Sequence, residues 1–337
     1  MHDEPVVDIH CHVFTQAARE LIEANYSHEQ IVAHDPYDLY AGSGSVATNK
    51  ELLPRIRPMM TDPARRLSDM DRMGVDVQVL ATFVSQFYYW ADAELGQALA
   101  RVQNDWLAEL VSVSPERFAA IGTVPMQDSA RAVAELDYLV NDLGFKGVQI
   151  SSNVAGLDLD DPRFFPFFAR AEELGAVVLI HPNGFTDMSR FTDYFLVNVM
   201  GNPMDSTLAL TRLVYAGVLE KLPRLKLCVV HGGGFIPSLH GRIDHAWERR
   251  PECQVNVPRP PSSYLKQVHF DTMVFSPEVL GALVGFAGAD HVLLGSDYPF
   301  DMGEEDPRGL IDRVGTLSAE EVSDIRGRNA VSLFGLD

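Results

Sequence analysis

Short apolar runs alternate with amphipathic segments along the chain of 337 residues. Eight runs are rich in Val, Ile and Leu and end in polar residues or glycine, which is typical of strands buried on both faces of a parallel sheet. These predicted strands cover residues 6–12, 76–83, 118–125, 145–151, 176–182, 226–232, 268–273 and 292–297. Helical periodicity between them predicts helices at residues 62–73, 95–113, 130–143, 162–174 and 277–286.

The alternation of strand and helix predicts an α/β fold of right-handed βαβ units. Eight such units favour a (β/α)8 TIM barrel over the alternative of an open, doubly wound sheet. Residues 13–61 follow the first strand and residues 183–222 follow the fifth, and both connections are too long for simple loops. We expect them to be insertions over the C-terminal face of the barrel, where such enzymes place their chemistry. No linker or repeat divides the chain, so a single domain over residues 1–337 is expected.

Histidine and aspartate stand at the ends of four predicted strands. His10 and His12 end the first strand, and side-chain alternation places both on one face with Cys11 on the other. His181 ends the fifth strand, His231 the sixth and Asp297 the eighth. One such residue alone would be read as a cap or a hydrogen-bonded group. Together, the strand ends predict imidazole and carboxylate ligands for a divalent ion, with positions left for water or substrate.

Charge and composition exclude several classes of function. The chain has 27 Lys and Arg against 47 Asp and Glu, a formal net charge of −20, and no basic run. We therefore expect no binding to nucleic acid or to an anionic membrane surface. The acidic N-terminus is unlike a signal peptide, and no stretch approaches the roughly 20 apolar residues of a membrane span. Three cysteines without paired spacing suit a reducing compartment, so a cytoplasmic location is expected.

These strand ends and the motifs around them carry a family resemblance. The sequence resembles the amidohydrolase superfamily of metal-dependent barrels, and within it the α-amino-β-carboxymuconate-ε-semialdehyde decarboxylase (ACMSD) branch. The resemblance covers essentially the whole chain through DIHCHVF at 8–14, DVQVLAT at 76–82, YYWAD at 88–92, GTVPMQD at 122–128, KGVQIS at 146–151, HGGGF at 231–235, GRIDHAW at 241–247 and LLGSDYPF at 293–300.

The resemblance implies a role for each matching residue. It makes His10, His12, His181 and Asp297 the ligands of a zinc ion, with manganese as another possible divalent metal. His231 becomes the acid/base residue that activates metal-bound water, and Asp297 is counted with it among the catalytic residues. The resemblance also implies a homodimer in which Arg242 reaches into the neighbouring subunit's site to hold a substrate carboxylate.

Other residues are expected to bind the substrate. A family arginine in the first insertion matches Arg55, with Arg57 as the second choice. Arginine suits a carboxylate because its guanidinium donates two parallel hydrogen bonds and stays charged. Trp90, in an aromatic group after the second strand, is expected to line the pocket for a flat substrate, although core packing is nearly as good a reading. Tyr194 stands where the family has a substrate-facing tryptophan.

The segment after His181 departs from the family pattern. Where the decarboxylases usually have Pro-Trp-Asp, this chain has Pro-Asn-Gly at residues 182–184. This change and Tyr194 fall where substrate is recognised, so the metal chemistry is better supported than the identity of the substrate.

Three functions remain open at this point. The leading hypothesis is a zinc-dependent, non-oxidative decarboxylase of a small unsaturated or aromatic carboxylate. The alternative is a metal-dependent hydrolase or hydratase of the same superfamily acting on a related ring or muconate compound. The third is a catalytically silent metal-binding or interaction protein, which the complete ligand set and His231 argue against. A dication and arginines would reverse the local sign of charge for a small carboxylate within an otherwise acidic protein.

Overall fold

The computed structural model describes residues 4–35, 39–40, 42–184 and 188–336. All eight predicted strands are present and every pair among them is parallel. One sheet has the order β1 (Val7–Val13), β2 (Val77–Thr82), β3 (Phe118–Ala120). The other has the order β10 (Val292–Leu293), β9 (Val268–Asp271), β8 (Lys226–Val229), β7 (Val177–His181), β4 (Gly147–Ser151). A two-stranded antiparallel hairpin, β5 (Asn153–Val154) with β6 (Leu157–Asp158), was not predicted.

Both edges of the three-stranded sheet are joined to the five-stranded sheet. Gly122, just beyond β3, forms a parallel bridge with Val148 of β4. At the other edge Cys11 of β1 forms a parallel bridge with Tyr298, and the His12 amide donates to the Tyr298 carbonyl at 2.8 Å. Backbone hydrogen bonds therefore link the eight strands without an open edge between the two sheets.

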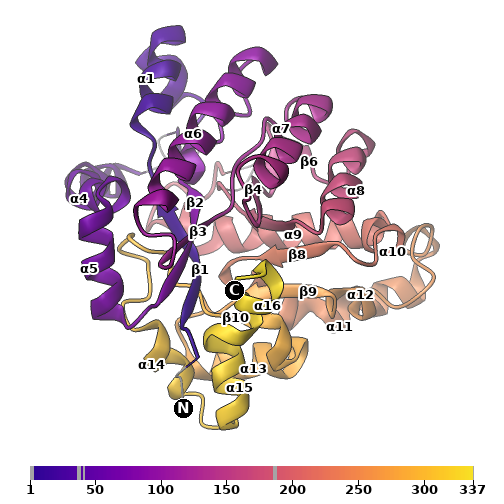
Figure 1. Cartoon of the computed structure of the whole chain (residues 1–337). Coiled ribbons are helices and arrows are strands. Elements are labelled where there is room, and N and C mark those ends of the chain that lie inside the picture. Colours follow the sequence, from indigo (N-terminus) through magenta and orange to yellow (C-terminus); the bar gives the residue numbers. More distant parts are fainter. Residues whose placement is uncertain (1–3, 36–38, 41, 185–187, 337) are drawn as a thin grey trace.

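The five predicted helices are confirmed and lie around the strands (Figure 1). They are α5 (Pro63–Met73), α6 (Ala93–Val113), α7 (Ser129–Asn141), α8 (Phe165–Leu174) and α13 (Pro277–Ala287). Local chemistry sets where they begin: the carboxylate of Asp62 accepts from the amides of Ala64 and Arg65, and Asp92 caps α6 in the same way.

The sequence pattern did not predict the helices in the two long connections. After β1 the chain forms α1 (Gln16–Asn25), α2 (His28–Val32) and α4 (Ser43–Thr61); after β7 it forms a π-helical turn η3 (Val197–Gly201), α9 (Asn202–Tyr215) and α10 (Val218–Lys221). Further helices are α11 (Ile236–Arg249), α12 (Ser262–Leu265), α14 (Pro307–Asp312), α15 (Ala319–Ser323) and α16 (Asn329–Phe334). Short helical turns are η1 (Val84–Gln86), η2 (Pro162–Phe164), η4 (His231–Gly233), η5 (Pro251–Cys253), η6 (Ala289–His291) and η7 (Asp324–Arg328).

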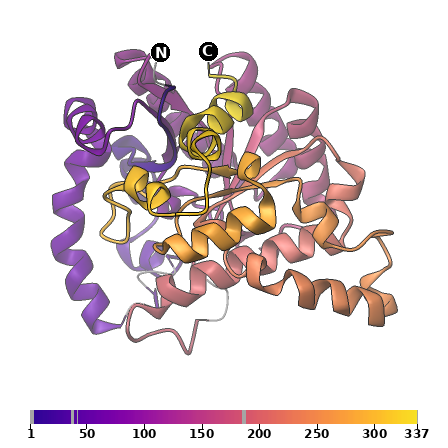
Figure 2. The same ribbon diagram turned by 90° about the horizontal axis from the view of Figure 1, so that it is seen from below.

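The apolar core has two main parts. One cluster joins Val7 and Ile9 of β1 to Leu179 of β7 and to Leu333 of α16. A larger cluster lies between the strands and the helices and includes Cys11, which is fully buried. The beginning and the end of the described chain lie on the same side of the molecule, as the view from below shows (Figure 2). None of the described helices is long and apolar enough to cross a membrane.

Candidate functional site

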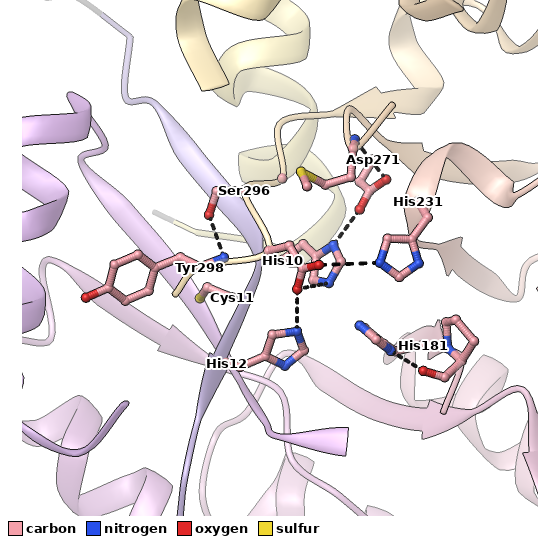
Figure 3. A network of polar contacts seen from close by, with 12 residues as sticks. His10, Cys11, His12, His181, His231, Asp271, Ser296 and Tyr298 are labelled. Carbon is pink, nitrogen blue, oxygen red and sulfur yellow. Dashed lines mark hydrogen bonds and ion pairs between the residues drawn. The ribbon is translucent and has the colours of Figure 1, made fainter. Parts of the chain in front are cut away.

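The structure brings together four of the residues that the sequence singled out. One potential ligand atom from each of His10, His12, His181 and Asp297 lies within 4.8 Å of all the others, and all four residues are buried. His10 and His12 belong to β1, His181 is the last residue of β7, and Asp297 follows β10. The C-terminal ends of three strands therefore form one cluster of imidazole nitrogens and carboxylate oxygens (Figure 3).

The Asp297 carboxylate lies among three of the imidazoles. Its Oδ1 is 3.0 Å from His12 Nε2 and 3.4 Å from His10 Nε2. Its Oδ2 is 3.6 Å from Nε2 of His231, which follows β8. The His231 ring centroid is 5.1 Å from that of His10 and 5.0 Å from that of His181. His231 thus stands beside the four-residue cluster (Figure 3).

Two hydrogen bonds fix how the histidines present their second nitrogen. His10 Nδ1 is 2.6 Å from Oδ2 of Asp271, at the end of β9, and His181 Nδ1 is 2.6 Å from the Pro182 carbonyl. A carboxylate or carbonyl on one ring nitrogen sets the tautomer and orients the other nitrogen for a metal. Asp271 is itself held by the Gly232 amide, which donates to Oδ1 at 2.8 Å.

The backbone around the cluster departs from regular strand geometry. The pairing register of β1 with β2 shifts between Asp8 and Cys11, and such bulges re-aim side chains near active sites. His231 and Asp297 both adopt φ of 56°, in the left-handed region that non-glycine residues rarely enter. A Cβ added to Gly295 would lie 2.9 Å from the His10 Cβ, so glycine is required there. The strand ends are thus shaped to aim these side chains.

Burial and charge act together on the cluster. Burial alone would raise the pKa of Asp297, yet the charge of His10 and hydrogen bonds with His12 and His231 hold that pKa well below its usual value. Burial, followed by the positive charges of the other histidines, lowers the pKa of His181 well below its usual value. Burial opposes the charged form of His10, but Asp297 and Asp271 overcome it and raise the pKa. Two carboxylates therefore create a field that favours positive charge at the centre.

The donor set fits a divalent metal ion. Among the described residues, the buried Nε2 atoms of His10 and His181 have no hydrogen-bond partner, although buried polar atoms are normally paired. Imidazole and carboxylate donors are those that zinc and related divalent ions take, and neutral His181 and ionised Asp297 are in the protonation states that ligation needs.

A buried polar network supports β1 behind the cluster. Asp8 accepts from the Ser296 hydroxyl at 2.6 Å and from Gln78 Nε2 at 3.0 Å. Gln78 in turn accepts from Arg66, whose guanidinium also donates to the His12 carbonyl. This network joins β1, β2, α5 and the segment that carries Asp297, so it ties the ligand-bearing segments to one another.

A cavity of about 930 Å³ opens onto the cluster at His12, His181 and Asp297. Aromatic side chains form much of its wall, with two arginines among its polar residues: Phe14, Phe83, Tyr88, Tyr89, Trp90, Phe195 and Phe300, with Arg19 and Arg57. Its volume falls within the range of pockets for small organic molecules.

The residues expected to bind substrate fall into two groups. Trp90 lines the cavity and stacks on His34 with ring centroids 4.5 Å apart. Arg55 is exposed and its Nε donates to the Glu51 carbonyl, so the first choice in α4 lies outside the cavity. The second choice, Arg57, lines the cavity, with its guanidinium carbon 3.5 Å from the Phe14 ring centroid. Side chains two residues apart on a helix point in directions about 200° apart. This explains why Arg57 lines the cavity and Arg55 does not.

Two further expected residues are outside this cavity. Tyr194 has 90% of its surface exposed, and the neighbouring Phe195 lines the cavity instead. Arg242 is exposed on α11 and does not line the cavity of its own chain. Its expected role concerns a neighbouring subunit and stays a prediction.

Sequence reasoning missed several residues near the site. Asp271 was not singled out, although it stands at the end of β9 as the ligands stand at the ends of their strands. Arg19 lies in a connection whose helices the pattern did not reveal. Glycines 232–234 all have positive φ and form the turn after β8.

Nearly the whole chain is similar to known proteins. The sequence profile of the family described as "Amidohydrolase" matches residues 7–336. A protein named 2-amino-3-carboxymuconate-6-semialdehyde decarboxylase from Dictyostelium discoideum is 40% identical over 277 residues, covering 82% of this chain and 77% of that protein.

Solved structures share the fold. 5-carboxyvanillate decarboxylase from Sphingomonas paucimobilis superposes with a TM-score of 0.85 and 26% identity, covering 99% of each chain. A 5-carboxyvanillate decarboxylase from Novosphingobium aromaticivorans, complexed with manganese and 4-hydroxy-3-methoxy-5-nitrobenzoic acid, gives a TM-score of 0.83 at 24% identity, covering 99% of this chain and 96% of that one.

Proposed function

The chain belongs to the amidohydrolase family, and from this premise we propose that it is a metal-dependent, non-oxidative decarboxylase, a carbon–carbon lyase acting on a small unsaturated or aromatic carboxylate. The observation that carries the proposal is the four-ligand cluster at one end of a cavity with aromatic walls and arginines. Relatives named as decarboxylases of a carboxymuconate and of a carboxylated ring support the same class of substrate.

We propose that the eight joined strands form a single-domain (β/α)8 barrel. In it, the two long connections are insertions over the C-terminal face, which accords with residues of both lining the cavity. Active sites of such barrels lie at that face because each strand end can contribute a side chain to a shared site.

His10, His12, His181 and Asp297 would hold the metal. A divalent ion there would supply positive charge that stabilises negative charge developing on the substrate. Zinc is the ion we propose for this donor set, with manganese as the other choice because a related decarboxylase structure contains it.

The chain's own residues orient the substrate and move the proton. Decarboxylation replaces a carboxylate by hydrogen: the carbon accepts a proton, the bond to the carboxylate breaks, and CO₂ leaves. His231 can hold and move a proton at Nε2, which lies 3.6 Å from Asp297 Oδ2 at the cluster. The aromatic side chains of the cavity wall, Trp90 among them, pack against a flat substrate and exclude water from it.

Arg57 is the residue of this chain that we propose for holding a substrate carboxylate, because it lines the cavity and remains able to form two parallel hydrogen bonds. We also propose a cytoplasmic homodimer in which Arg242 of one subunit enters the site of the other. Mixing Arg242→Ala and His231→Ala dimers under subunit exchange should restore activity if the site is shared. Verified heterodimers without recovered activity would contradict the sharing.

The test of the proposed reaction combines metal analysis with product mass. The purified protein is offered carboxylated muconate semialdehydes and hydroxybenzoates without oxygen, nicotinamide or pyridoxal phosphate. We expect a product lighter by the mass of CO₂. A product heavier by the mass of water would identify the hydrolase or hydratase alternative instead.

A further inference from the structure

The β5–β6 hairpin forms part of the cavity wall beside the four-residue cluster. Its residues Asn153, Ala155 and Gly156 line the cavity. The hairpin follows β4, whose last residue, Ser151, pairs in register with His181 at the end of β7. It therefore leaves the sheet next to a strand end that contributes to the cluster, and its position bears directly on the shape of the site.

The hairpin is too short to hold its own position. Each of its two antiparallel strands has only two residues. The residues that join them, Ala155 and Gly156, have φ of 50° and 85°. Two central residues of positive φ are typical of a type I′ turn, and the left-handed region is strained for Ala155 because it carries a Cβ. Since isolated two-stranded hairpins are marginally stable in water, contacts with the rest of the protein must fix this one.

Asp205 on α9 provides a buried anchor for the hairpin. Its Oδ2 accepts a hydrogen bond from the Ser152 hydroxyl and another, at 3.0 Å, from Asn153 Nδ2. Asn153 Oδ1 in turn accepts from the Gly156 amide at 3.1 Å. Asp205 and Ser152 each have 2% of their surface exposed. The connection therefore runs from α9 through Asn153 to the turn of the hairpin and is shielded from water.

The groups that contact the Asp205 carboxylate are neutral. Burial raises the pKa of Asp205, the hydrogen bonds from Ser152 and Asn153 act in the opposite direction, and the charge of Asp158 raises the pKa further. The net effect is a raised pKa, so the hydrogen bonds offset the cost of burying the charge only in part. Without the acceptor, the buried Ser152 hydroxyl and the Asn153 amide group would lose the partner that they share.

Arg212, further along α9, makes the second link to the hairpin. Its Nε lies 3.2 Å from Asp158 Oδ2 and 2.8 Å from Asp160 Oδ1. The side chains of Arg212 and Asp158 are 44% and 37% exposed, and ion pairs so open to water contribute little. Asp205 therefore fixes the hairpin more strongly than Arg212 does.

The first turn of α9 also holds another segment of the cavity wall. Asn202 Oδ1 accepts from the Gly184 amide at 3.0 Å, and both residues line the cavity. Asn202 and Asp205 are three positions apart, so they are neighbours on one side of the helix. One turn of α9 thus connects the segment that follows β7 with the hairpin that follows β4.

We infer that Asp205 is a positioning residue for the substrate: through Ser152 and Asn153 it fixes the hairpin as a wall of the cavity and thereby determines how tightly a ligand binds. The inference rests on the proposed function, because it concerns the ligand of the same cavity. Asp205 lies behind the wall, not among the described residues that line the cavity. It acts through its neighbours and takes no part in metal binding or in proton transfer.

The test measures ligand binding and hairpin opening in variants of Asp205. Binding of salicylate (2-hydroxybenzoate) to the metal-loaded protein is measured by calorimetry, and opening by hydrogen–deuterium exchange of residues 152–158. Asp205→Ala removes the acceptor, whereas Asp205→Asn keeps an oxygen that can accept at the place of Oδ2. Glu135→Ala is the matched control, because Glu135 is a buried carboxylate of α7 that accepts from Asn104 at 2.8 Å, away from the cavity.

We expect Asp205→Ala to weaken salicylate binding by about 10-fold and to speed exchange in the hairpin by about 10-fold or more, as the loss of one or two hydrogen bonds implies. Its metal content should be unchanged. Asp205→Asn and Glu135→Ala should both bind salicylate within about 3-fold of the wild type, although Glu135→Ala lowers stability. Unaltered binding or exchange in Asp205→Ala, an equal loss of affinity in Glu135→Ala, or an Asp205→Asn variant as weak as Asp205→Ala would overturn the inference.

A second variant keeps the inference testable if Asp205→Ala does not fold. Ser152→Ala removes one donor and leaves Asp205 in place, so salicylate binding should weaken by about 3-fold and exchange in the hairpin should rise. No change in either would contradict the anchor. Release of CO₂ is measured separately: its absence from every carboxylate tried would contradict the proposed function, whereas hairpin exchange and the ratio of affinities between the variants decide the role of Asp205.

Discussion

The ends of the strands and the wall of the cavity above them are built in different ways. Each of the four clustered ligand residues has at most 7% of its surface exposed, and each is carried by a strand or by the residues just after one. The cavity wall draws Arg19 and Arg57 from the helices α1 and α4, and these side chains are partly exposed. The first region is fixed by the sheet, while the second can change without disturbing it. Chemistry and substrate choice are therefore separable in this molecule.

The largest effect is expected when one of the four metal-ligating side chains is removed. His12→Ala should abolish stoichiometric metal binding and, with the loss of several kcal/mol of charge stabilisation, lower kcat/KM by more than about 1,000-fold. Elemental analysis and CO₂ release measure the two effects. His245→Ala is the matched control, since His245 is 66% exposed on α11. An active protein without metal would contradict the role of the cluster.

His231 should separate chemistry from metal binding within the strand-end region. His231→Ala should keep its metal, because His231 is not one of the four ligands, and lose about 100- to 10,000-fold in kcat as expected for an acid/base residue. Metal stoichiometry and single-turnover rates give the two readouts. Full activity with metal retained would remove His231 from the mechanism.

A substitution of Asp271 tests whether metal binding at the strand ends depends on residues that contact the metal-ligating histidines. Asp271→Asn keeps the shape of the side chain but weakens its hold on His10 Nδ1, now at 2.6 Å. Metal affinity should fall by about 10- to 100-fold, as for other residues that orient a ligand. Competition with a chelator measures the affinity, and His12→Ala sets the limit of complete loss. An unchanged affinity would show that His10 is oriented without Asp271.

The cavity wall is tested by two arginines on one helix. Arg57→Ala should lower kcat/KM by about 10- to 100-fold through loss of a charged hydrogen bond, and it should leave metal binding intact. Arg55→Ala should stay within about 2-fold, because surface changes away from a site have little effect. The opposite ranking in steady-state kinetics would restore Arg55 as the residue that meets the substrate.

The change expected to affect the site least is at His269, near the start of β9, and it concerns the pH dependence of stability. Burial, followed by the charge of His291, lowers the pKa of His269 to about 4, below its usual 6.5. His269 is then neutral in the folded protein, so unfolding takes up a proton between these values and stability falls as pH drops from 6.5 to 4. His269→Gln should remove about 1–3 kcal/mol of that acid-dependent loss in urea titrations, with metal content unchanged. An identical pH dependence in the two proteins would contradict this.

The two regions also differ in how far the sequence predicted them. The strands and five helices followed from apolar periodicity, because buried elements must repeat their apolar positions. The ligand residues could be grouped because the ends of parallel strands meet at one edge. In contrast, α4 has Pro54 and Pro58 inside it and few buried residues, so no clear period marked it.

Where an exposed helix carries the residue, sequence spacing could not decide between neighbours. From the sequence alone, Arg55 and Arg57 match the expected substrate-binding arginine about equally well. Only the direction in which each side chain points from α4 separates them. Asp271 was hidden for a related reason: one aspartate at a strand end has the same pattern whether it caps a turn or orients a histidine. Its contact with His10 spans 261 positions of sequence, which no local pattern records.

The most direct test of the central claim is CO₂ release as a function of bound metal. The protein is stripped with a chelator, its metal content is verified, and turnover of a carboxylated ring or muconate compound is measured before and after titration with zinc or manganese. We predict no turnover in the stripped protein and recovery in proportion to the ion bound, up to one per chain. Undiminished CO₂ release from protein verified to lack metal would contradict the account.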